Sequence, residues 1–387
     1  MSNSPVSVRR YDLDWLRVIA FFLLIYYHTA ILFTPGGIPM IQNSDTSELL
    51  SLLADFLHEF RLALLFLISG VGIAFARRRR SEREFLKERS VRLLIPMIFG
   101  IAVIVPPMIY LEKLFLNTFE GSFVSFYADF YTEGVYPKGH LSWHHFWFIA
   151  YLYLYCLMGQ PLFRHLDSED GKKEIVWIEN HRHGFRLYAY ILPLVIIEIA
   201  LRALFHGVPD LIHDWANYFH YFMILLAGYV FCSSEPLLDQ TETLRWRSLL
   251  LAIMTAGLLF YFFRMPEGGF APGPVISAIT IPEYLTFCLV RIANIWFWLM
   301  TILGWSSRYL RFSTPLLGYL NQAVYPLFIL HLTVITTLGY LAVTWQADLW
   351  IKYMFITTGT ILLCLALYQT VIKPFSLMQL CFGVKKL

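Results

Sequence analysis

The sequence is poor in charged residues, and this scarcity excludes most water-soluble folds. Asp, Glu, Lys and Arg make up 15% of the 387 residues and apolar residues 58%, whereas soluble domains average about 25% charged and about 45–50% apolar. The net charge of +3 is small, and the basic residues are scattered among apolar runs, which argues against a nucleic-acid-binding protein. The class that remains is a protein of apolar membrane-spanning helices.

Cysteine is scarce as well, and its spacing favours neither a disulfide scaffold nor a metal site. The five cysteines form no Cys-x-x-Cys pair and no Cys/His ligand pattern. No His-x-x-x-His pair with a nearby carboxylate is present either, so we predict no metal. The sequence also lacks a Ser/Gly-rich linker, a low-complexity tract and a repeat of fixed period. We therefore expect residues 1–387 to form a single membrane-embedded domain.

Long apolar runs predict an all-α, polytopic membrane protein. At about 20 residues per span, the hydropathy pattern gives about ten transmembrane helices. The first is expected to be a retained span and not a signal peptide, because its apolar run contains Tyr26, Tyr27 and His28 and has no small-x-small cleavage site. The predicted spans lie near residues 13–34, 51–76, 92–111, 144–163, 185–205, 216–232, 245–263, 283–304, 315–338 and 349–372.

The distribution of basic residues predicts the topology. If the N-terminus is cytoplasmic, most of the 30 Lys and Arg residues fall in cytoplasmic connections. The external connections then contain only Lys113, Lys138, Arg264 and Lys352. The positive-inside rule therefore places both termini in the cytoplasm.

Two ionisable residues share one face of the first span. Arg17 and His28 are eleven positions apart, which returns to nearly the same face and separates them by roughly 16 Å. A charge inside a bilayer costs about 2.5–3.5 kcal/mol on insertion scales, so such residues are functional candidates. The alternative is a snorkelling arginine and a histidine bonded to a neighbouring carbonyl.

The second span begins with four ionisable residues in seven positions: Asp55, His58, Glu59 and Arg61. The predicted topology places this cluster at the depth of His28, although an interfacial ion-pair network is an alternative explanation. Gly70, further along this span, belongs to a small-residue stretch that favours close approach of another helix.

The third span opens with two arginines that could bind phosphates. Arg89 and Arg92 lie three apart where the segment turns apolar, and paired guanidinium groups bind phosphate oxygens in a bidentate manner. The preceding run of four arginines is more typical of a topology anchor on anionic lipid.

Further polar residues mark the predicted external side and the later spans. Trp143 and His144 belong to an aromatic, polar segment of the kind that stacks on sugar rings, although aromatic belts alone also explain tryptophan there. Glu198 and Arg202 are expected to form a structural i,i+4 pair. Other intramembrane candidates are Arg291, Asn321, Tyr325 and His331.

These residues together resemble the membrane-bound acyltransferase family 3, most closely its glucan biosynthesis protein C branch, which succinylates periplasmic glucans. The likeness extends over nearly the whole chain. It is carried by Asp14-Trp15-Leu16-Arg17 with His28, by Asp55 to Arg61 followed by Phe66 to Gly70, by Arg89-x-x-Arg92-x-x-x-Pro96, by Phe146-Trp147-Phe148, and by Asn321 to His331.

The resemblance implies roles for particular residues. His28 would be the essential histidine, Arg17 its helix partner, and Arg89 and Arg92 the contact for cytosolic acyl-CoA. Some members carry a fused esterase-like domain, which is not expected here because the chain ends at Leu387. Residues that could contact the acceptor or the acyl chain are Asp55, His58, Glu59, Arg61, Trp143, His144, Arg291, Asn321, Tyr325 and His331.

The expected function is transfer of an acyl group, succinyl or acetyl, from cytosolic acyl-CoA to hydroxyls of an extracytoplasmic glucan or other polysaccharide. The expected location is a bacterial inner membrane, among membrane lipids. Arg61 and Arg291 are both candidates for pairing with a succinyl carboxylate, which would be costly to bury without a cation. The alternative is a secondary transporter of a small anionic or sugar-like solute. The missing internal repeat and the missing pair of matched broken helices count against it.

Overall fold

The computed structural model describes residues 10–35, 41–136, 138–181, 184–205, 210–263 and 280–384. Over these residues the chain is helical, and its β-structure is one isolated bridge between Val135 and Leu141. Arg264, one of the predicted external cations, lies outside the described residues. The longer helices are α1 (Tyr11–Ile31), α2 (Glu48–Arg77), α3 (Glu82–Arg89), α4 (Ile95–Phe99), α5 (Val105–Phe115), α6 (Phe123–Asp129), α7 (Trp147–Met158), α8 (Gln160–Asp167), α9 (Glu169–His181), α10 (Ile191–Leu201), α11 (Trp215–Ser233), α12 (Glu235–Phe263), α13 (Ile281–Tyr309), α14 (Pro315–Ala342), α15 (Leu349–Leu367) and α16 (Ser376–Cys381).

Seven of the described helices are long and apolar enough to cross a membrane. They are α1, α2, the continuous helix from Glu82 to Phe115, α12, α13, α14, and α15 extended to Ile372. The pair α7 and α8, bent by 56°, adds an eighth candidate. Several such helices indicate an integral membrane protein, as predicted.

The structure does not confirm the predicted number of about ten spans. The span predicted at 185–205 contains α10, which has only 11 residues, or about 17 Å at 1.5 Å per residue, against a hydrocarbon core of about 30 Å. The span predicted at 216–232 corresponds to α11. That helix has 19 residues but carries Asn217 and His220 in its first two turns, and it is not among the seven.

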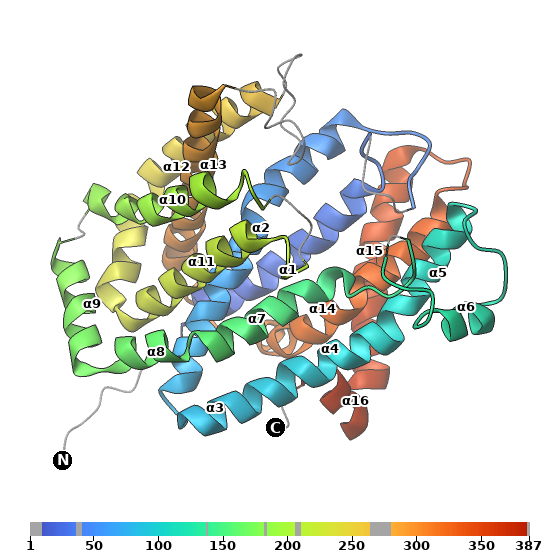
Figure 1. The fold of residues 1–387 in the computed structure, drawn as a ribbon, viewed down its shortest axis with the longest axis horizontal. Coiled ribbons are helices and arrows are strands. Elements are labelled where there is room, and N and C mark those ends of the chain that lie inside the picture. The colour runs from blue at the N-terminus through green and yellow to red at the C-terminus, as the bar shows by residue number, and fades with distance from the viewer. Residues whose placement is uncertain are drawn as a thin grey trace.

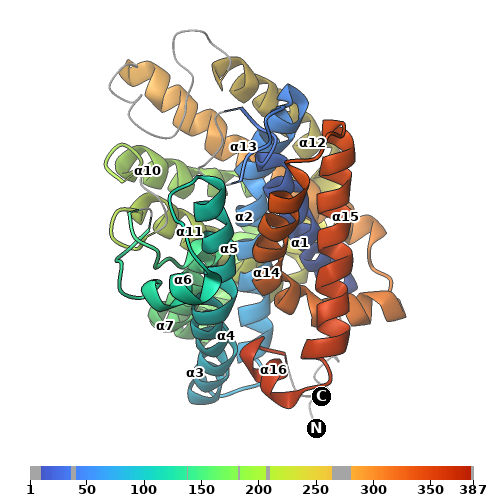
Figure 2. The same cartoon turned by 90° about the vertical axis from the view of Figure 1, so that its right-hand side faces the viewer.

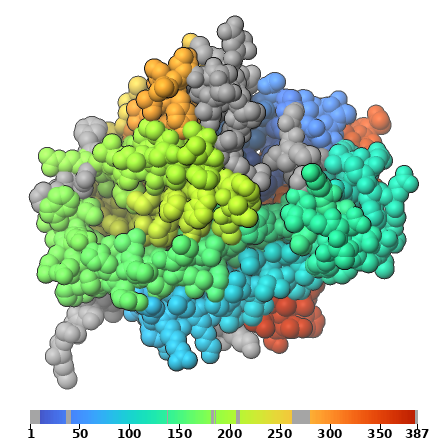
Figure 3. Space-filling model, viewed as in Figure 1, coloured from blue at the N-terminus to red at the C-terminus, as the bar shows by residue number. Residues whose placement is uncertain are grey.

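Helices α1 and α14 lie side by side in the interior of the bundle. Helix α1 contacts α2, α14 and α15, and α14 also contacts α5. Figures 1 and 2 show α1 and α14 running together, with α15 alongside. In the space-filling view, α3 to α8 together with α10 and α11 cover most of one face and leave little of the two central helices visible (Figure 3). Polar side chains on α1 and α14 can therefore meet away from lipid.

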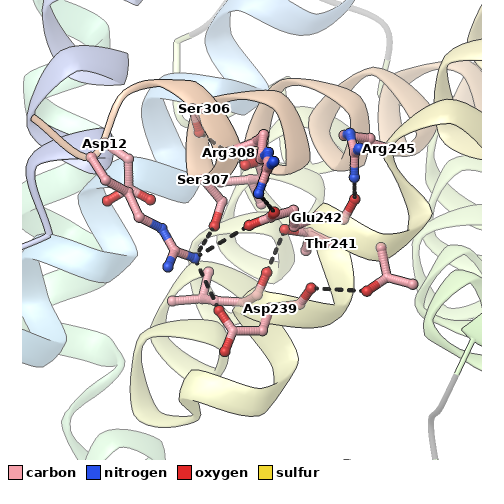
Figure 4. Close-up of polar contacts among 12 residues, drawn as sticks. Asp12, Asp239, Thr241, Glu242, Arg245, Ser306, Ser307 and Arg308 are labelled. Atoms are coloured by element: carbon pink, nitrogen blue, oxygen red, sulfur yellow. Dashed lines mark hydrogen bonds and ion pairs between the residues drawn. The ribbon is translucent and has the colours of Figure 1, made fainter.

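Basic residues gather at one end of the bundle. There the first turns of α12 lie against the last turns of α13, where Arg308 pairs with Glu242 at 3.5 Å (Figure 4). Arg10, at the start of α1, reaches Ser307 at the same place. The loop after α2 is tied to α11 at this end by Arg78, which donates to the carbonyl of Cys232 at 2.9 Å. In Figure 2 the short helices α3 and α16 also lie at one end of the molecule.

The small residues of the second span allow α2 and α11 to cross closely, as predicted. A Cβ atom added at Gly70 would lie 1.9 Å from the carbonyl oxygen of Leu225, and one added at Gly228 would lie 2.0 Å from that of Leu67. Neither side tolerates a methyl group without moving backbone. This contact fixes α11 against α2 and so positions the residues at the far end of both helices.

Gly70→Ala is expected to lower the thermal unfolding temperature of the detergent-solubilised protein by several degrees, because overpacking a close contact typically costs about 1–3 kcal/mol. Gly257→Ala in α12 is the matched control, since a Cβ there meets nothing within 4 Å. The control should unfold at the wild-type temperature or slightly above it. Equal unfolding temperatures for the two variants would contradict a close α2–α11 crossing.

Candidate active site

Two imidazoles meet between the central helices. Nε2 of His331 on α14 lies 3.2 Å from Nδ1 of His28 on α1. His331 is completely buried, whereas His28 is partly accessible. The structure therefore brings together two predicted residues that are 303 positions apart in the chain.

The hydrogen bonds of this pair determine which nitrogen carries each proton. Nδ1 of His331 lies 2.6 Å from the carbonyl oxygen of Phe328, and a carbonyl oxygen can only accept. Nδ1 of neutral His331 is therefore protonated, and its Nε2 accepts a hydrogen bond from Nδ1–H of His28. Neutral His28 then has its lone pair on Nε2, the nitrogen that faces away from His331. This is the tautomer that a general base requires.

A third histidine supports the pair from the loop before α7. Nε2 of His145 lies 3.2 Å from the carbonyl oxygen of Ile329, and the rings of His145 and His331 are 5.2 Å apart. His145 is buried, and its contact holds the loop against the segment of α14 that carries His331. His145 was not among the residues singled out from the sequence, because it adjoins the aromatic, polar segment of Trp143 and His144 and gives no separate signal there.

Trp143 and His144 lie in the same loop but outside the imidazole pair. The ring of His144 is 5.1 Å from that of Tyr136, whose hydroxyl donates to Glu112 at 2.8 Å. The pKa of Tyr136 is raised, mainly because the side chain is partly buried and in addition because the Glu112 carboxylate is close to it. The hydroxyl therefore keeps its proton and donates to Glu112. His144 has a left-handed backbone with φ of 39°, an unusual conformation for a non-glycine residue. Trp143 is partly accessible.

Arg61 reaches the site through Tyr27. The guanidinium carbon of Arg61 lies 3.3 Å from the centre of the Tyr27 ring, and the Tyr27 hydroxyl lies 3.1 Å from Nδ1 of His58. Tyr27 also contacts its neighbour His28, with ring centres 5.0 Å apart. Arg61 and His58 of α2 therefore lie at the level of His28, as predicted. Tyr27 was not predicted as a site residue, because a tyrosine in an apolar run gives no signal beyond membrane character.

Glu59 points elsewhere, so the cluster on α2 does not act as one unit. Its carboxylate lies 3.0 Å from Nε of Arg291 on α13, and Nη1 of the same arginine lies 2.6 Å from Glu198. Glu198 also pairs with Arg202 at 2.9 Å, which agrees with the structural pair predicted from sequence. These four residues form a buried chain of alternating charges across α2, α13 and α10. Asp55, one turn earlier on α2, is exposed.

Arg17 lies one level below the imidazole pair. Its Nη1 is 3.5 Å from Oδ1 of Asn321 and 3.7 Å from Asp14. Arg17 and His28 are separated by about 16 Å along α1, and Asn321 and His331 by about 15 Å along α14. The two helices thus present two matched polar levels. Arg17 and His28 therefore lie on one helix at the separation expected from the sequence, and they are not in direct contact.

Arg89 and Arg92 share one carboxylate at the basic end. Glu88 lies 3.4 Å from Nε of Arg89 and 3.1 Å from Nη1 of Arg92. Arg92 also donates to the carbonyl of Gly383, and its own carbonyl accepts from the Tyr325 hydroxyl at 3.0 Å. One acid against two guanidinium groups leaves a net positive charge. Tyr325 and Asn321 are one turn apart on α14, so this pair lies next to the lower polar level.

The described residues contain no candidate metal site. No group of three His, Cys, Asp or Glu side chains there is arranged to bind a metal ion. The imidazole pair is held by the hydrogen bond between its two rings and by the bond of His331 to the Phe328 carbonyl.

Comparisons with known proteins agree with this description. The acyltransferase domain family matches residues 10–369. A protein named "Glucans biosynthesis protein C" from Shigella dysenteriae is 26% identical over 170 residues, which cover 43% of this chain and 42% of that protein. The protein of the same name from Salmonella paratyphi B is 27% identical over 167 residues, 42% of this chain and 41% of its own. The similarity therefore spans less than half the length of these relatives, and no solved structure matches the chain.

The family match begins at Arg10, before α1, and ends in the helical segment that follows α15, so it includes both polar levels of α1 and α14. The chain belongs to the acyltransferase domain family.

Proposed function

We propose that this protein is a membrane O-acyltransferase that moves an acyl group from cytosolic acyl-CoA to a hydroxyl of a glucan or similar polysaccharide on the opposite side. The observation that carries this proposal is the 3.2 Å contact between His28 and His331. This contact leaves the lone pair on Nε2 of His28 available to accept a proton. The helix that carries His28, α1, starts at the basic end. Membership of the acyltransferase family supports the same reaction.

In the proposed reaction, Nε2 of His28 takes the proton from the acceptor hydroxyl. The hydroxyl oxygen forms a bond to the thioester carbon, and the carbon–sulfur bond then breaks. The proton passes from His28 to the departing thiolate, which gives free CoA and an ester. While His28 is protonated, its Nδ1–H remains bonded to Nε2 of His331, and this bond stabilises the imidazolium.

The donor is proposed to enter from the basic end. Arg89 and Arg92 would bind the CoA phosphates, because they carry more positive charge than Glu88 neutralises. The pantetheine arm would then extend past Arg17 and Asn321 toward His28. The separation of about 16 Å between the two polar levels suits a long, thin arm whose thioester must reach the base. Nδ2 of Asn321 is buried without a hydrogen-bond partner among the described residues, and it is available to an amide of that arm.

The acceptor is proposed to approach from the other end, over the loop that carries Trp143 and His144. Aromatic faces stack on sugar rings, and Nε2 of His144 lacks a partner among the described residues, so it could bond a sugar hydroxyl. The basic end would face the cytoplasm with both termini, as the positive-inside rule requires. The names of the matched relatives support a glucan acceptor. Their bacterial sources, together with the candidate membrane spans, support the proposed location in a bacterial inner membrane.

A coupled assay separates this function from a secondary transporter. Purified protein in detergent would receive acetyl-CoA or succinyl-CoA with a soluble glucan, and free thiol would be followed with time. An acyltransferase releases CoA only when the acceptor is present and forms an equal amount of esterified glucan. A transporter would release none.

His28→Ala should reduce acyl transfer by at least about 100-fold, because general acid–base catalysis contributes about 10²–10⁴-fold. The helix remains apolar, so expression and the unfolding temperature should stay near wild type. His165→Ala is the control, since this histidine is exposed on α8 and bonded only to Glu174. Near-normal product from well-expressed His28→Ala protein would remove His28 from its proposed role.

The double variant Arg89→Ala/Arg92→Ala should raise the acyl-CoA concentration needed for half-maximal rate by about ten-fold or more. Each hydrogen bond to a charged group contributes about 1.5–3 kcal/mol. Contacts to the CoA phosphates affect the binding of the donor and not the acyl-transfer step, so the maximal rate should change less than the acyl-CoA requirement. Arg83→Ala/Lys87→Ala removes the same charge from exposed positions of α3 and is the matched control. Equal effects of the two double variants would mean that overall charge, and not the arginine pair, attracts the donor.

A further inference from the structure

Arg61 is a buried cation whose hydrogen-bonding capacity is largely unused. Its side chain is 5% exposed, and its Nε and Nη1 atoms have no hydrogen-bond partner among the described residues. No carboxylate of the described chain lies within ion-pair distance of it. The face of its guanidinium group is covered by the Tyr27 ring at 3.3 Å. The group is thus held by its face, while two of its N–H donors are buried without a hydrogen-bond partner among the described residues.

The contrast with Arg291 shows that this arrangement is not general in the bundle. Arg291 is held between Glu59 at 3.0 Å and Glu198 at 2.6 Å. Glu59 is only two residues from Arg61 in α2, yet its carboxylate is turned to α13. A buried charge without a counterion is costly in a membrane protein, and a bound anion would remove that cost. Of the two arginines considered from sequence, Arg61 is the one with side-chain donors that have no partner among the described residues, so it could bond an incoming carboxylate.

The position of Arg61 limits which anion can reach it. Tyr27 contacts both Arg61 and His28, so the guanidinium group lies at the level of the reacting atoms. Phosphates bound at Arg89 and Arg92 lie beyond the lower polar level, which is itself about 16 Å from His28 along α1. The anion must therefore be carried at the far end of the donor, beyond the thioester.

We infer that Arg61 binds a terminal carboxylate on the acyl chain and so selects dicarboxylic acyl donors over monocarboxylic ones. This inference rests on the proposed acyl transfer. A planar guanidinium group with two free N–H donors matches a carboxylate in geometry and charge. Its stacking on Tyr27 fixes that group before the donor arrives, which reduces the entropy lost on binding.

The test compares succinyl-CoA with butyryl-CoA, which has the same chain length without the carboxylate. Free CoA and esterified glucan are measured for wild type and for Arg61→Met, which keeps bulk but removes the charge. Succinyl transfer should fall by about 100-fold or more, because an unpaired buried carboxylate is strongly disfavoured. Butyryl transfer should change by only a few-fold, so the preference between the donors reverses. Arg61→Lys should restore part of the preference.

Arg291→Met is the contrasting variant. It leaves Glu59 and Glu198 without their shared cation, so it should lower the unfolding temperature by several degrees and reduce both donors to the same extent. If Arg61→Met also reduces both donors equally, Arg61 stabilises the reaction centre or contacts the acceptor, and the inference is wrong.

Calorimetric titration of the two acyl-CoA esters into the protein separates this inference from the proposed function. Wild type should bind succinyl-CoA more tightly than butyryl-CoA, and Arg61→Met should lose that difference even if no turnover occurs. Equal affinities of wild type for both esters would overturn the role of Arg61. Absence of CoA release with every donor, combined with a binding preference that depends on Arg61, would overturn acyl transfer alone.

Discussion

The contact between α1 and α14 is the constraint on which the rest of the site depends. A bilayer interior provides no water, so a buried imidazole must find its partners within the protein. His331 does so by bonding the carbonyl of Phe328 on its own helix, and that bond leaves its other nitrogen as an acceptor for His28. The protonation pattern of the pair thus follows from backbone geometry. Among the described residues no carboxylate bonds to either imidazole, so this pattern does not depend on one.

The buried charges divide into two kinds, and the division has a functional meaning. Glu59, Arg291, Glu198 and Arg202 neutralise one another and connect α2, α13 and α10. They stabilise the arrangement of helices around the site. Removing any one of them would leave the charge of its partner buried without a counterion, which is destabilising. Arg61 is of the other kind, because its guanidinium group stacks on an aromatic ring and two of its buried donors have no partner among the described residues. A buried guanidinium group without a counterion among the described residues, at the level of the imidazole pair, is a suitable place for a charged substrate group.

Much of the fold and part of the site could be predicted from the sequence. Hydropathy identified the long spans because each contains enough apolar residues, and helical periodicity placed Arg17 and His28 on one face. The same periodicity could not reveal that Arg17 meets Asn321 while His28 meets His331, because it describes one helix and not its neighbour. It places Glu59 and Arg61 on different faces of α2, because residues two apart in a helix do not face each other, but it could not show that Glu59 meets Arg291 and Arg61 meets Tyr27. The span count was uncertain for a related reason, because a hydropathy window does not detect that α10 ends after 11 residues.

The central claim is that one site joins a donor from one side of the membrane to an acceptor on the other. The direct measurement is transfer across sealed vesicles that contain the full-length protein, with acyl-CoA enclosed and soluble glucan outside. Neither substrate crosses a lipid bilayer unaided. The account predicts acylated glucan in the external solution and free CoA inside the vesicles. Acylated glucan that forms only when donor and acceptor are on the same side would contradict it.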